Sequence, residues 1–162
     1  MTANVVVPLL VGVLALLSVV WAARAQARAA EQHQMRQARI DAYADCARRL
    51  YLFRGATINR CKSRFAGDTG ATRNDARQHA YETGAEALAA IARIQISGDR
   101  AVHQLARDAY KAVQSLNREE TGDALEENAK AAADRIEAMV GRFSDMGASK
   151  TTSDRALEHS FR

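Results

Sequence analysis

The chain has 162 residues, a formal net charge of +4, 48% apolar residues and 26% charged residues. These values exclude a disordered acidic chain and a protein buried throughout in a membrane, and the length predicts one folded domain. Alanine contributes 34 residues and aromatic residues only 6%, which predicts helices with close contacts of small area, and two cysteines are too few for a disulfide framework.

The first predicted element is a transmembrane helix. Residues 5–22 contain no charged side chain, and a helix of this length with one flanking residue at each end spans about 30 Å, the thickness of a hydrocarbon core. Trp21 lies near the far end, where interfacial aromatic residues are enriched. The pattern therefore predicts an anchor at residues 1–23. A cleaved signal peptide is the alternative, because residues 25–27 read Ala-Gln-Ala, although no Lys or Arg precedes the apolar run.

The charges around this segment predict its orientation. Arg24 and Arg28 follow it, whereas only the α-amino group precedes it, so the positive-inside rule places the N-terminus outside the plasma (inner) membrane and the C-terminal body in the cytoplasm. Arg24 and Arg28, with Trp21, are the expected contacts to membrane lipids. Small residues also recur along one side of the segment and are candidates for packing against a second copy. These residues are Gly12, Ala15, Ser18 and Ala22.

A basic juxtamembrane helix is predicted at residues 24–66. Residues 24–65 hold ten Lys and Arg but three Asp and Glu, a net charge of +7. The arginines beyond Arg28 are interpreted as a solvated helix face, with a nucleic-acid surface over residues 36–64 as the alternative. An apolar stripe at helical spacing predicts the buried side of this helix. It consists of Tyr43, Cys46, Leu50, Phe53, Thr57, Cys61 and Phe65.

Helical hairpins are predicted at residues 71–146, after a break at residues 67–70. Gly98 is expected to end one helix, Asp99 to cap the next, and Thr121 to begin the last. Three apolar stripes mark their buried faces. They are Tyr81, Gly84, Leu88, Ile91 and Ile94, flanked by Ala87 and Ala90; Val102, Leu105, Ala106, Ala109, Val113 and Leu116; and Leu125, Ala129, Ala133, Ile136, Val140 and Phe143.

The predicted fold class is all-α, with one N-terminal transmembrane helix followed by an antiparallel bundle of about four helices. Residues 147–162 are polar and without periodicity, which predicts a flexible tail. The large share of alanine limits the area of each helix contact. Help from a partner or from self-association is therefore expected.

Residues 89–102, AAIARIQISGDRAV, resemble a helical hairpin of small single-span actinobacterial membrane proteins. In that group an alanine-rich helix ends in a glycine turn, and the next helix begins with an acidic residue and a valine. An arginine-rich helix also follows the span, as residues 36–49 do here. The group resembles the KilB-like proteins encoded near plasmid-transfer functions. The resemblance implies a membrane-anchored helical protein, and it carries over no functional residue.

The sequence contains no recognised catalytic motif. The four histidines form no HExxH pattern, glycine-rich phosphate loops are missing, and the acidic residues of 119–127 lack the spacing of a calcium loop. Cys46 and Cys61 lie about 22 Å apart on one straight helix, too far for a disulfide, and are predicted to be buried thiols. A bridge would require a helix break near Gly55 and an extracytoplasmic body. Neither an enzyme nor a metal or cofactor site is expected.

These features favour a single-pass membrane protein that acts as a tether or interaction module. Its expected partners are membrane lipids, a cytosolic or membrane protein, and a second copy of the chain. The alternative is a membrane-linked nucleic-acid-binding or plasmid-transfer factor that uses the basic segment. Nucleic acid is the less expected partner, because residues 66–162 carry a net charge of −3 and no recognised nucleic-acid module is present.

Overall fold

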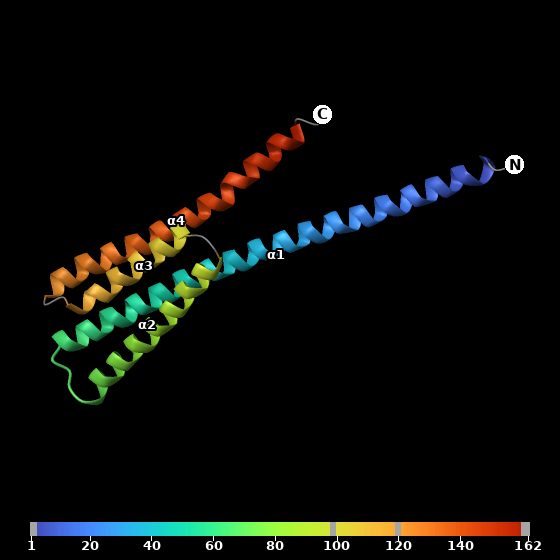
Figure 1. Ribbon diagram of the computed structural model, residues 1–162. Coiled ribbons are helices and arrows are strands. Elements are labelled where there is room, and N and C mark those ends of the chain that lie inside the picture. The colour runs from blue at the N-terminus through green and yellow to red at the C-terminus, as the bar shows by residue number, and fades with distance from the viewer. Residues whose placement is uncertain (1–2, 98–99, 119–120, 160–162) are drawn as a thin grey trace. The chain divides into compact units, whose positions relative to one another are not determined.

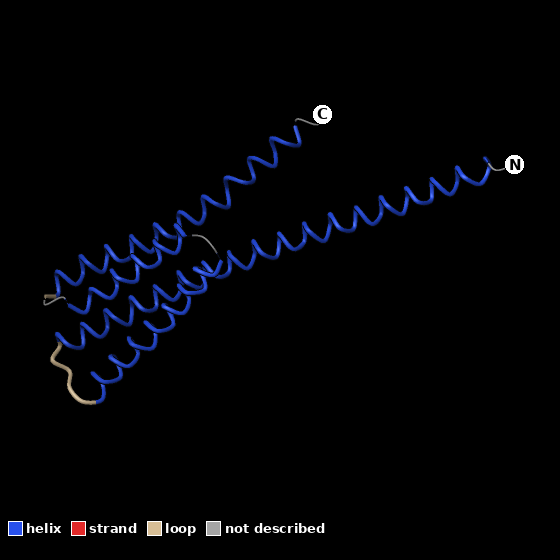
Figure 2. Tube along the Cα trace, viewed as in Figure 1, coloured by secondary structure: helices blue, strands red, loops and turns tan. Residues whose placement is uncertain are grey.

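The computed structural model describes the backbone of residues 3–97, 100–118 and 121–159, and the side chains of residues 16–96, 100–118 and 121–144. All secondary structure in these ranges is helical (Figures 1 and 2). The elements are α1 (Ala3–Phe65), α2 (Ala71–Ser97), α3 (Arg100–Ser115), the 3-10 turn η1 (Leu116–Arg118) and α4 (Gly122–His159). The predicted all-α class is confirmed.

The chain divides into two compact units, Met1–Arg39 and Ile40–Arg162, and each is considered by itself. In the second unit the later part of α1 lies beside α2, and α3 lies beside α4 (Figure 1). Consecutive helices of this unit run in opposite directions, and one hydrophobic core joins all four. This arrangement confirms the predicted antiparallel bundle.

The core stripe of α1 is almost the predicted one. Its residues from Tyr43 to Cys61 are buried, whereas Phe65 is 39% exposed at the end of the helix. Two aromatic contacts join α1 to the later helices. The Phe53 ring stacks on Tyr110 with centroids 5.0 Å apart, and the Tyr43 ring meets the edge of Phe143 at 5.2 Å.

The buried face of α2 differs from the prediction. Tyr81 and Leu88 are exposed, at 53% and 49%, and smaller residues replace them in the core. The cause is the close approach of α2 to α1. A Cβ atom on Gly84 would lie only 2.9 Å from Cε2 of Phe53, so this part of the face has room for small side chains only. Ala80 and Ala87 accordingly occupy it, whereas Ile91 and Ile94 are buried further along the helix.

The faces of α3 and α4 follow the predicted stripes with one shift. Val102, Ala106 and Leu116 are fully buried on α3 and η1 as predicted. On α4, however, Ala132 and Met139 are buried, whereas Val140 is 38% exposed. At two positions of α4 the buried residue is therefore the one that precedes the predicted residue, Ala133 or Val140. Adjacent residues lie only 100° apart around a helix, so sequence spacing does not separate them clearly.

The helix boundaries agree with the predicted turns where the structure describes them. Gly67 and Gly70 separate α1 from α2 with φ angles of 71° and 69°, a left-handed conformation that suits glycine. At the start of α4, the Ala124 N–H donates to Thr121 Oγ1 at 3.3 Å, as expected of a capping residue. Residues 98–99, where another cap was predicted, lie outside the described residues.

Helix α4 continues to His159, so residues 147–159 are helical although the sequence shows no periodicity there. The side chains of this segment lie outside the described part of the chain. Flexibility of residues 147–162 stays a prediction.

The first unit contains the predicted membrane anchor. Its described side chains, residues 16–39, are all exposed, including Trp21 at 77%. Within the part of the chain that was described, no helix combines enough length with enough apolar character to cross a membrane. The predicted apolar run begins at residue 5, however, and the side chains of residues 5–15 are outside the described set. The anchor therefore stays a prediction.

Candidate anion-binding site

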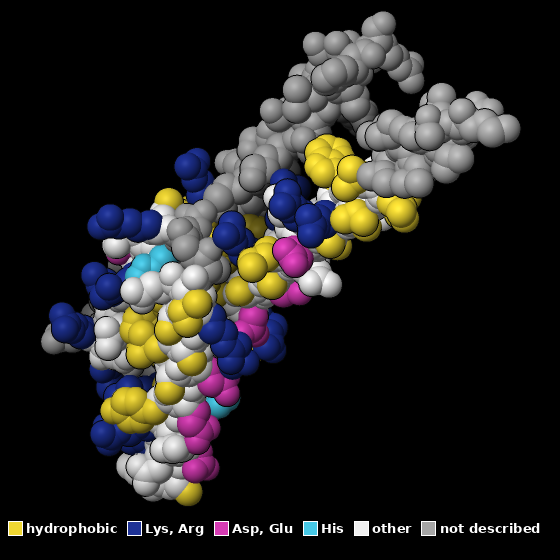
Figure 3. Space-filling model, turned by 45° about the vertical axis from the view of Figure 1, so that its right-hand side comes forward, with side chains coloured by type: hydrophobic (Ala, Val, Ile, Leu, Met, Phe, Trp, Pro, Cys, Tyr) yellow, Lys and Arg dark blue, Asp and Glu magenta, His cyan; other side chains and the backbone are white. Residues whose placement is uncertain are grey.

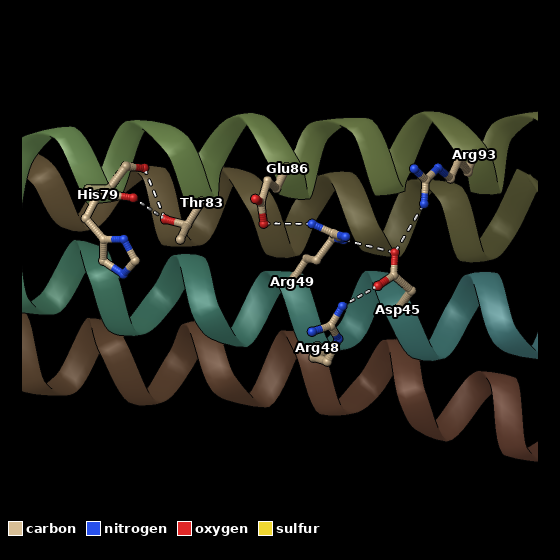
Figure 4. A network of polar contacts seen from close by, with 8 residues as sticks. Asp45, Arg48, Arg49, His79, Thr83, Glu86 and Arg93 are labelled. Carbon is tan, nitrogen blue, oxygen red and sulfur yellow. Dashed lines mark hydrogen bonds and ion pairs between the residues drawn. The ribbon is translucent and has the colours of Figure 1, made fainter.

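Two groups of arginines lie between α1 and α2. We call the first the paired cluster, because its arginines form ion pairs with two carboxylates (Figure 4). Asp45 accepts from Arg48 at 2.8 Å, from Arg49 at 2.9 Å and from Arg93 at 3.4 Å. Arg49 also donates to Glu86 at 2.7 Å. The cluster therefore crosses from α1, which supplies three of these side chains, to α2, which supplies Glu86 and Arg93.

Local sequence spacing builds half of the paired cluster. Asp45 precedes Arg48 and Arg49 by three and four residues, the distances at which side chains meet on one helix face. The hydrogen bond from Arg48, with the contacts of Arg49, holds the pKa of the Asp45 carboxyl below its ordinary value despite partial burial. Asp45 is therefore ionised at neutral pH, and its charge is used within the fold.

The second group surrounds a cavity of about 100 Å³, which we call the arginine pocket. The last turns of α1 and the first turns of α2 supply its cationic side chains, and the glycine turn at residues 67–70 brings these helix ends together. Among the residues that the structure describes, no acidic side chain lines this cavity. The lining residues are Arg60, Cys61, Arg64, Arg73, Arg77 and Asn117.

Neighbouring groups hold several of these guanidinium groups in place. Arg64 donates from Nη1 to the Asn117 carbonyl oxygen at 2.9 Å. The guanidinium carbons of Arg60 and Arg77 lie 5.2 and 5.5 Å from the centroid of the Tyr81 ring, within cation–π range. Arg77 also donates to the Tyr81 hydroxyl at 3.5 Å. This hydrogen bond and the charges of Arg77 and Arg60 lower the pKa of Tyr81.

Two further polar groups belong to the pocket. The Cys61 thiol is 1% exposed and donates to the Leu116 carbonyl oxygen at 3.3 Å. Asn117 Oδ1 is buried and accepts no hydrogen bond from the described residues. The pocket thus contains many donors and one unused acceptor.

The two groups differ in their charge balance. Arg60, Arg73 and Arg77 form no ion pair with any described residue, whereas the arginines of the paired cluster contact Asp45 and Glu86. A guanidinium group carries a permanent positive charge and presents donors in a fork that fits the oxygens of an anion. The arginine pocket is therefore the candidate site for an anion.

Charged side chains are also separated on one face of the molecule. In the lower part of Figure 3, Lys and Arg side chains lie mainly along the left edge and Asp and Glu side chains along the right.

The predicted membrane-interface residues lie in the first unit. Trp21, Arg24 and Arg28 are exposed side chains of α1, as are Ser18 and Ala22 of the predicted packing stripe. The side chains of the other two stripe residues, Gly12 and Ala15, lie outside the described residues. The role of each of these residues stays a prediction.

The alternative nucleic-acid surface over residues 36–64 is divided in the structure. Arg48 and Arg49 belong to the paired cluster, and Arg54 donates from Nε to the Ala129 carbonyl oxygen at 2.8 Å. Arg60 and Arg64 line the arginine pocket. This stretch of α1 therefore contributes its arginines to several different environments.

Sequence reasoning missed Arg73 and Arg77. Their signal is a repeated spacing, because Arg60 and Arg64 are four residues apart on one side of the glycine turn and Arg73 and Arg77 are four apart on the other. Such pairs share a helix face, and an antiparallel turn brings the two faces together. This pattern is visible only when the two helices of the hairpin are compared with each other.

Cys46 and Cys61 are both buried thiols, as predicted. Burial, with a smaller contribution from the Asp45 carboxylate, raises the pKa of Cys46 to about 12. Its thiol is therefore protonated and unreactive at neutral pH. No group of His, Cys, Asp and Glu in the described part of the chain could hold a metal ion.

A model of the KilB plasmid transfer protein family matches residues 40–146. The chain belongs to this family. The matched range begins at Ile40, where the second compact unit also begins, and includes both the paired cluster and the arginine pocket. Neither a curated protein nor a solved structure matches the chain.

Proposed function

We propose that this KilB-family chain is a non-catalytic interaction protein in plasmid transfer, anchored to the membrane through residues 5–22. The family match carries the plasmid-transfer role, because it covers the helical bundle rather than a short motif. The bundle is then the part of the protein that meets other components. Its expected partners are membrane lipids, a second copy of the chain and another protein of the transfer apparatus.

The chemistry of the arginine pocket supports binding rather than catalysis. Guanidinium groups do not release their protons near neutral pH, so they cannot exchange protons with a substrate as general acids or bases do. The one nucleophilic atom at the pocket, Cys61 Sγ, donates to a backbone carbonyl and is almost inaccessible. These groups suit the retention and orientation of an anion.

The sequence of the first unit supports the anchor. Residues 5–22 are uncharged, and Arg24 and Arg28 follow on one side only. Exposed Trp21 would lie at the interface between lipid and water in this arrangement. The anchor would hold the bundle at the cytoplasmic face of the plasma membrane, with the short N-terminus outside.

Extended nucleic-acid binding along residues 36–64 receives less support. The paired cluster neutralises Arg48 and Arg49, and Arg54 binds a backbone carbonyl. A cationic path that follows a nucleic-acid backbone requires arginines with free donors. Arg48, Arg49 and Arg54 therefore do not continue such a path along α1.

Deletion of the gene in its native host tests the proposal. We expect the frequency of plasmid transfer to recipient cells to fall, and expression of the full chain to restore it. A variant that starts at residue 24 should move from the membrane fraction to the soluble fraction and should restore transfer poorly. Unchanged transfer after deletion would contradict the plasmid-transfer role, and a full-length chain found in the soluble fraction would contradict the anchor.

A further inference from the structure

We propose that the arginine pocket binds a terminal phosphate group, which has at most one ester bond and carries up to two negative charges, as in inorganic phosphate, small organic phosphates and the phosphorylated end of a nucleic-acid strand. This assignment goes beyond the role in plasmid transfer and stands on the pocket itself. It depends on three features: the convergence of charge, the match of donors to acceptors, and the contacts that hold three of the four arginines.

The first feature is the convergence of four cations on one small cavity. Arg60 and Arg64 approach from α1, and Arg73 and Arg77 approach from α2. The cavity measures about 100 Å³ and, among the described residues, has no carboxylate in its lining. Such concentration favours a compact anion with more than one negative charge. A chain of singly charged phosphodiesters instead favours cations distributed along a path.

The second feature is the match of hydrogen-bonding groups. Each guanidinium group offers five N–H donors, and pairs of them bind two oxygens of a phosphate at once. A carboxylate has two oxygens, whereas a phosphate monoester presents three terminal oxygens to arginines from both helices. Asn117 Oδ1 is a buried acceptor without a partner among the described residues. A hydroxyl group of the ligand, either P–OH or one on the attached sugar, can donate to it.

The third feature is preorganisation. The Tyr81 ring lies against the guanidinium groups of Arg60 and Arg77, and the Asn117 carbonyl accepts from Arg64. Side chains that are already held lose less conformational freedom when a ligand binds. Arg73 approaches from the first turn of α2 and completes the ring of cations. Contacts within the fold therefore hold Arg60, Arg64 and Arg77 before the anion enters.

Isothermal titration of the purified full-length chain in detergent tests this proposal. The three probes are inorganic phosphate, a short single-stranded oligonucleotide with a 5′-phosphate, and the same oligonucleotide with a 5′-hydroxyl. We expect saturable binding of inorganic phosphate, of the 5′-phosphorylated strand or of both, and much weaker binding of the 5′-hydroxyl strand. Binding of inorganic phosphate identifies a free phosphate as sufficient, whereas binding of the phosphorylated strand alone identifies a strand end.

Paired variants assign any binding to the pocket. The variant Arg73→Gln with Arg77→Gln should weaken binding by roughly tenfold or more, because it removes charged donors from the site. The control variant Arg48→Gln with Arg93→Gln changes the net charge equally but lies in the paired cluster, and it should bind within about twofold of wild type, because it removes no pocket donor. Circular dichroism checks that both variants remain helical. If the first variant does not fold, Arg73→Lys with Arg77→Lys keeps the charge, removes the forks and should still weaken binding.

Three results would overturn the assignment. The first is the absence of binding by any probe, and the second is equal loss of affinity in the pocket variant and its control. The third is equal, arginine-dependent binding of the two oligonucleotides, which would identify internal phosphodiesters as the ligand. The transfer assay in cells is independent of these measurements, so failure here leaves the plasmid-transfer role untouched.

Discussion

The paired cluster and the arginine pocket lie on the same two helices and use the same residue type, but only the arginines of the paired cluster have carboxylate partners within their group. In the paired cluster Asp45 and Glu86 accept from three arginines. In the pocket, four arginines surround a cavity, and no carboxylate of the described residues lines it. The comparison teaches that the role of an arginine depends on whether a carboxylate lies beside it. The number of arginines in the segment does not determine that role.

The difference has an energetic consequence for each group. Opposite charges in the paired cluster attract and join α1 to α2, so this group supports the fold. Like charges in the pocket repel, although the surrounding water and salt screen much of this repulsion. A local arrangement that adds little stability is characteristic of functional sites, where the ligand supplies the missing charge.

The largest expected effect comes from changing the contact that brings both groups together. Gly84 packs on Phe53 between them, and a Cβ atom there would lie 2.9 Å from the ring. We expect Gly84→Ala to lower the free energy of unfolding by about 1–2 kcal/mol, because the overpacking exceeds the gain in helix propensity. Urea denaturation followed by circular dichroism measures this change.

Gly55→Ala is the matched control for that substitution. Gly55 also lies inside a helix, but a Cβ atom there meets nothing within 4 Å. Only the gain in helix propensity from glycine to alanine remains, so the free energy of unfolding should rise by up to about 1 kcal/mol. If the two variants were equally stable, the close approach of α1 and α2 would not be what fixes the positions of the two arginine groups.

A smaller effect is expected from breaking the paired cluster. Asp45→Asn removes the carboxylate that three arginines share, and we expect a loss of about 1 kcal/mol at pH 7. The exposed Asp134, which has no ion pair among the described residues, provides the control Asp134→Asn, with a change within about 0.5 kcal/mol. Equal losses in both variants would show that the cluster is no more than a set of weak surface contacts.

The pH dependence of this difference follows from the lowered pKa of Asp45. The folded chain binds this proton more weakly than the unfolded chain, so the ion pairs stabilise the fold fully above the ordinary pKa of 3.8. The contribution of these ion pairs to the free energy of unfolding is lost as the pH falls through the lowered pKa of Asp45. Wild type and Asp45→Asn should therefore become equally stable at strongly acidic pH, and a difference that persisted there would have to come from packing.

The arginine pocket should respond in the opposite direction. Arg73 lies in the first turns of α2, where a cation is unfavourable, and it adds to the charge of the pocket. We expect Arg73→Gln to raise the free energy of unfolding by up to about 0.5 kcal/mol in the absence of phosphate. Denaturation at low salt measures it, and raising the salt should diminish the gain. A clear loss of stability would mean that the pocket supports the fold as the paired cluster does.

The smallest effect distinguishes the two cysteines, one in each region. Cys46 follows Asp45 in the core, has a pKa raised to about 12, and is 0% exposed. Cys61 is also buried, but it lines the arginine pocket. We expect a small thiol reagent at pH 8 to modify Cys61 slowly and Cys46 more slowly still, as measured by mass spectrometry of peptides. Faster modification of Cys46 would contradict this order.

Much of the fold could be predicted because apolar residues that recur at three- and four-residue steps mark the buried faces of helices clearly. The stripe from Tyr43 to Cys61 and the break at residues 67–70 were predicted correctly. The orientation of α2 was not, since side-chain size favoured Tyr81 and Leu88 as core residues. Packing of Gly84 on Phe53 decides that orientation, and this contact involves residues 31 positions apart.

The candidate site was harder to predict than the fold. By sequence alone, residues 24–65 form one basic segment, although Arg49 and Arg60 lie in different electrostatic surroundings. The difference arises from α2, which contributes Glu86 to one group and Arg73 to the other. Composition along one helix cannot reveal which charges a second helix places opposite. Only the structure of the hairpin assigns each arginine to the paired cluster or to the arginine pocket.

The alanines of the core have a consequence for how the family can vary. Residues such as Ala87, Ala109 and Ala132 are completely buried where helices meet. Enlarging any of them forces helices apart, whereas loss of one methyl group removes little buried surface. Mutational tolerance at these alanines is therefore inverted relative to Leu50, Ile94 and Leu116 of the same core, where truncation is the more damaging change. Divergence should be slowest at its smallest buried residues.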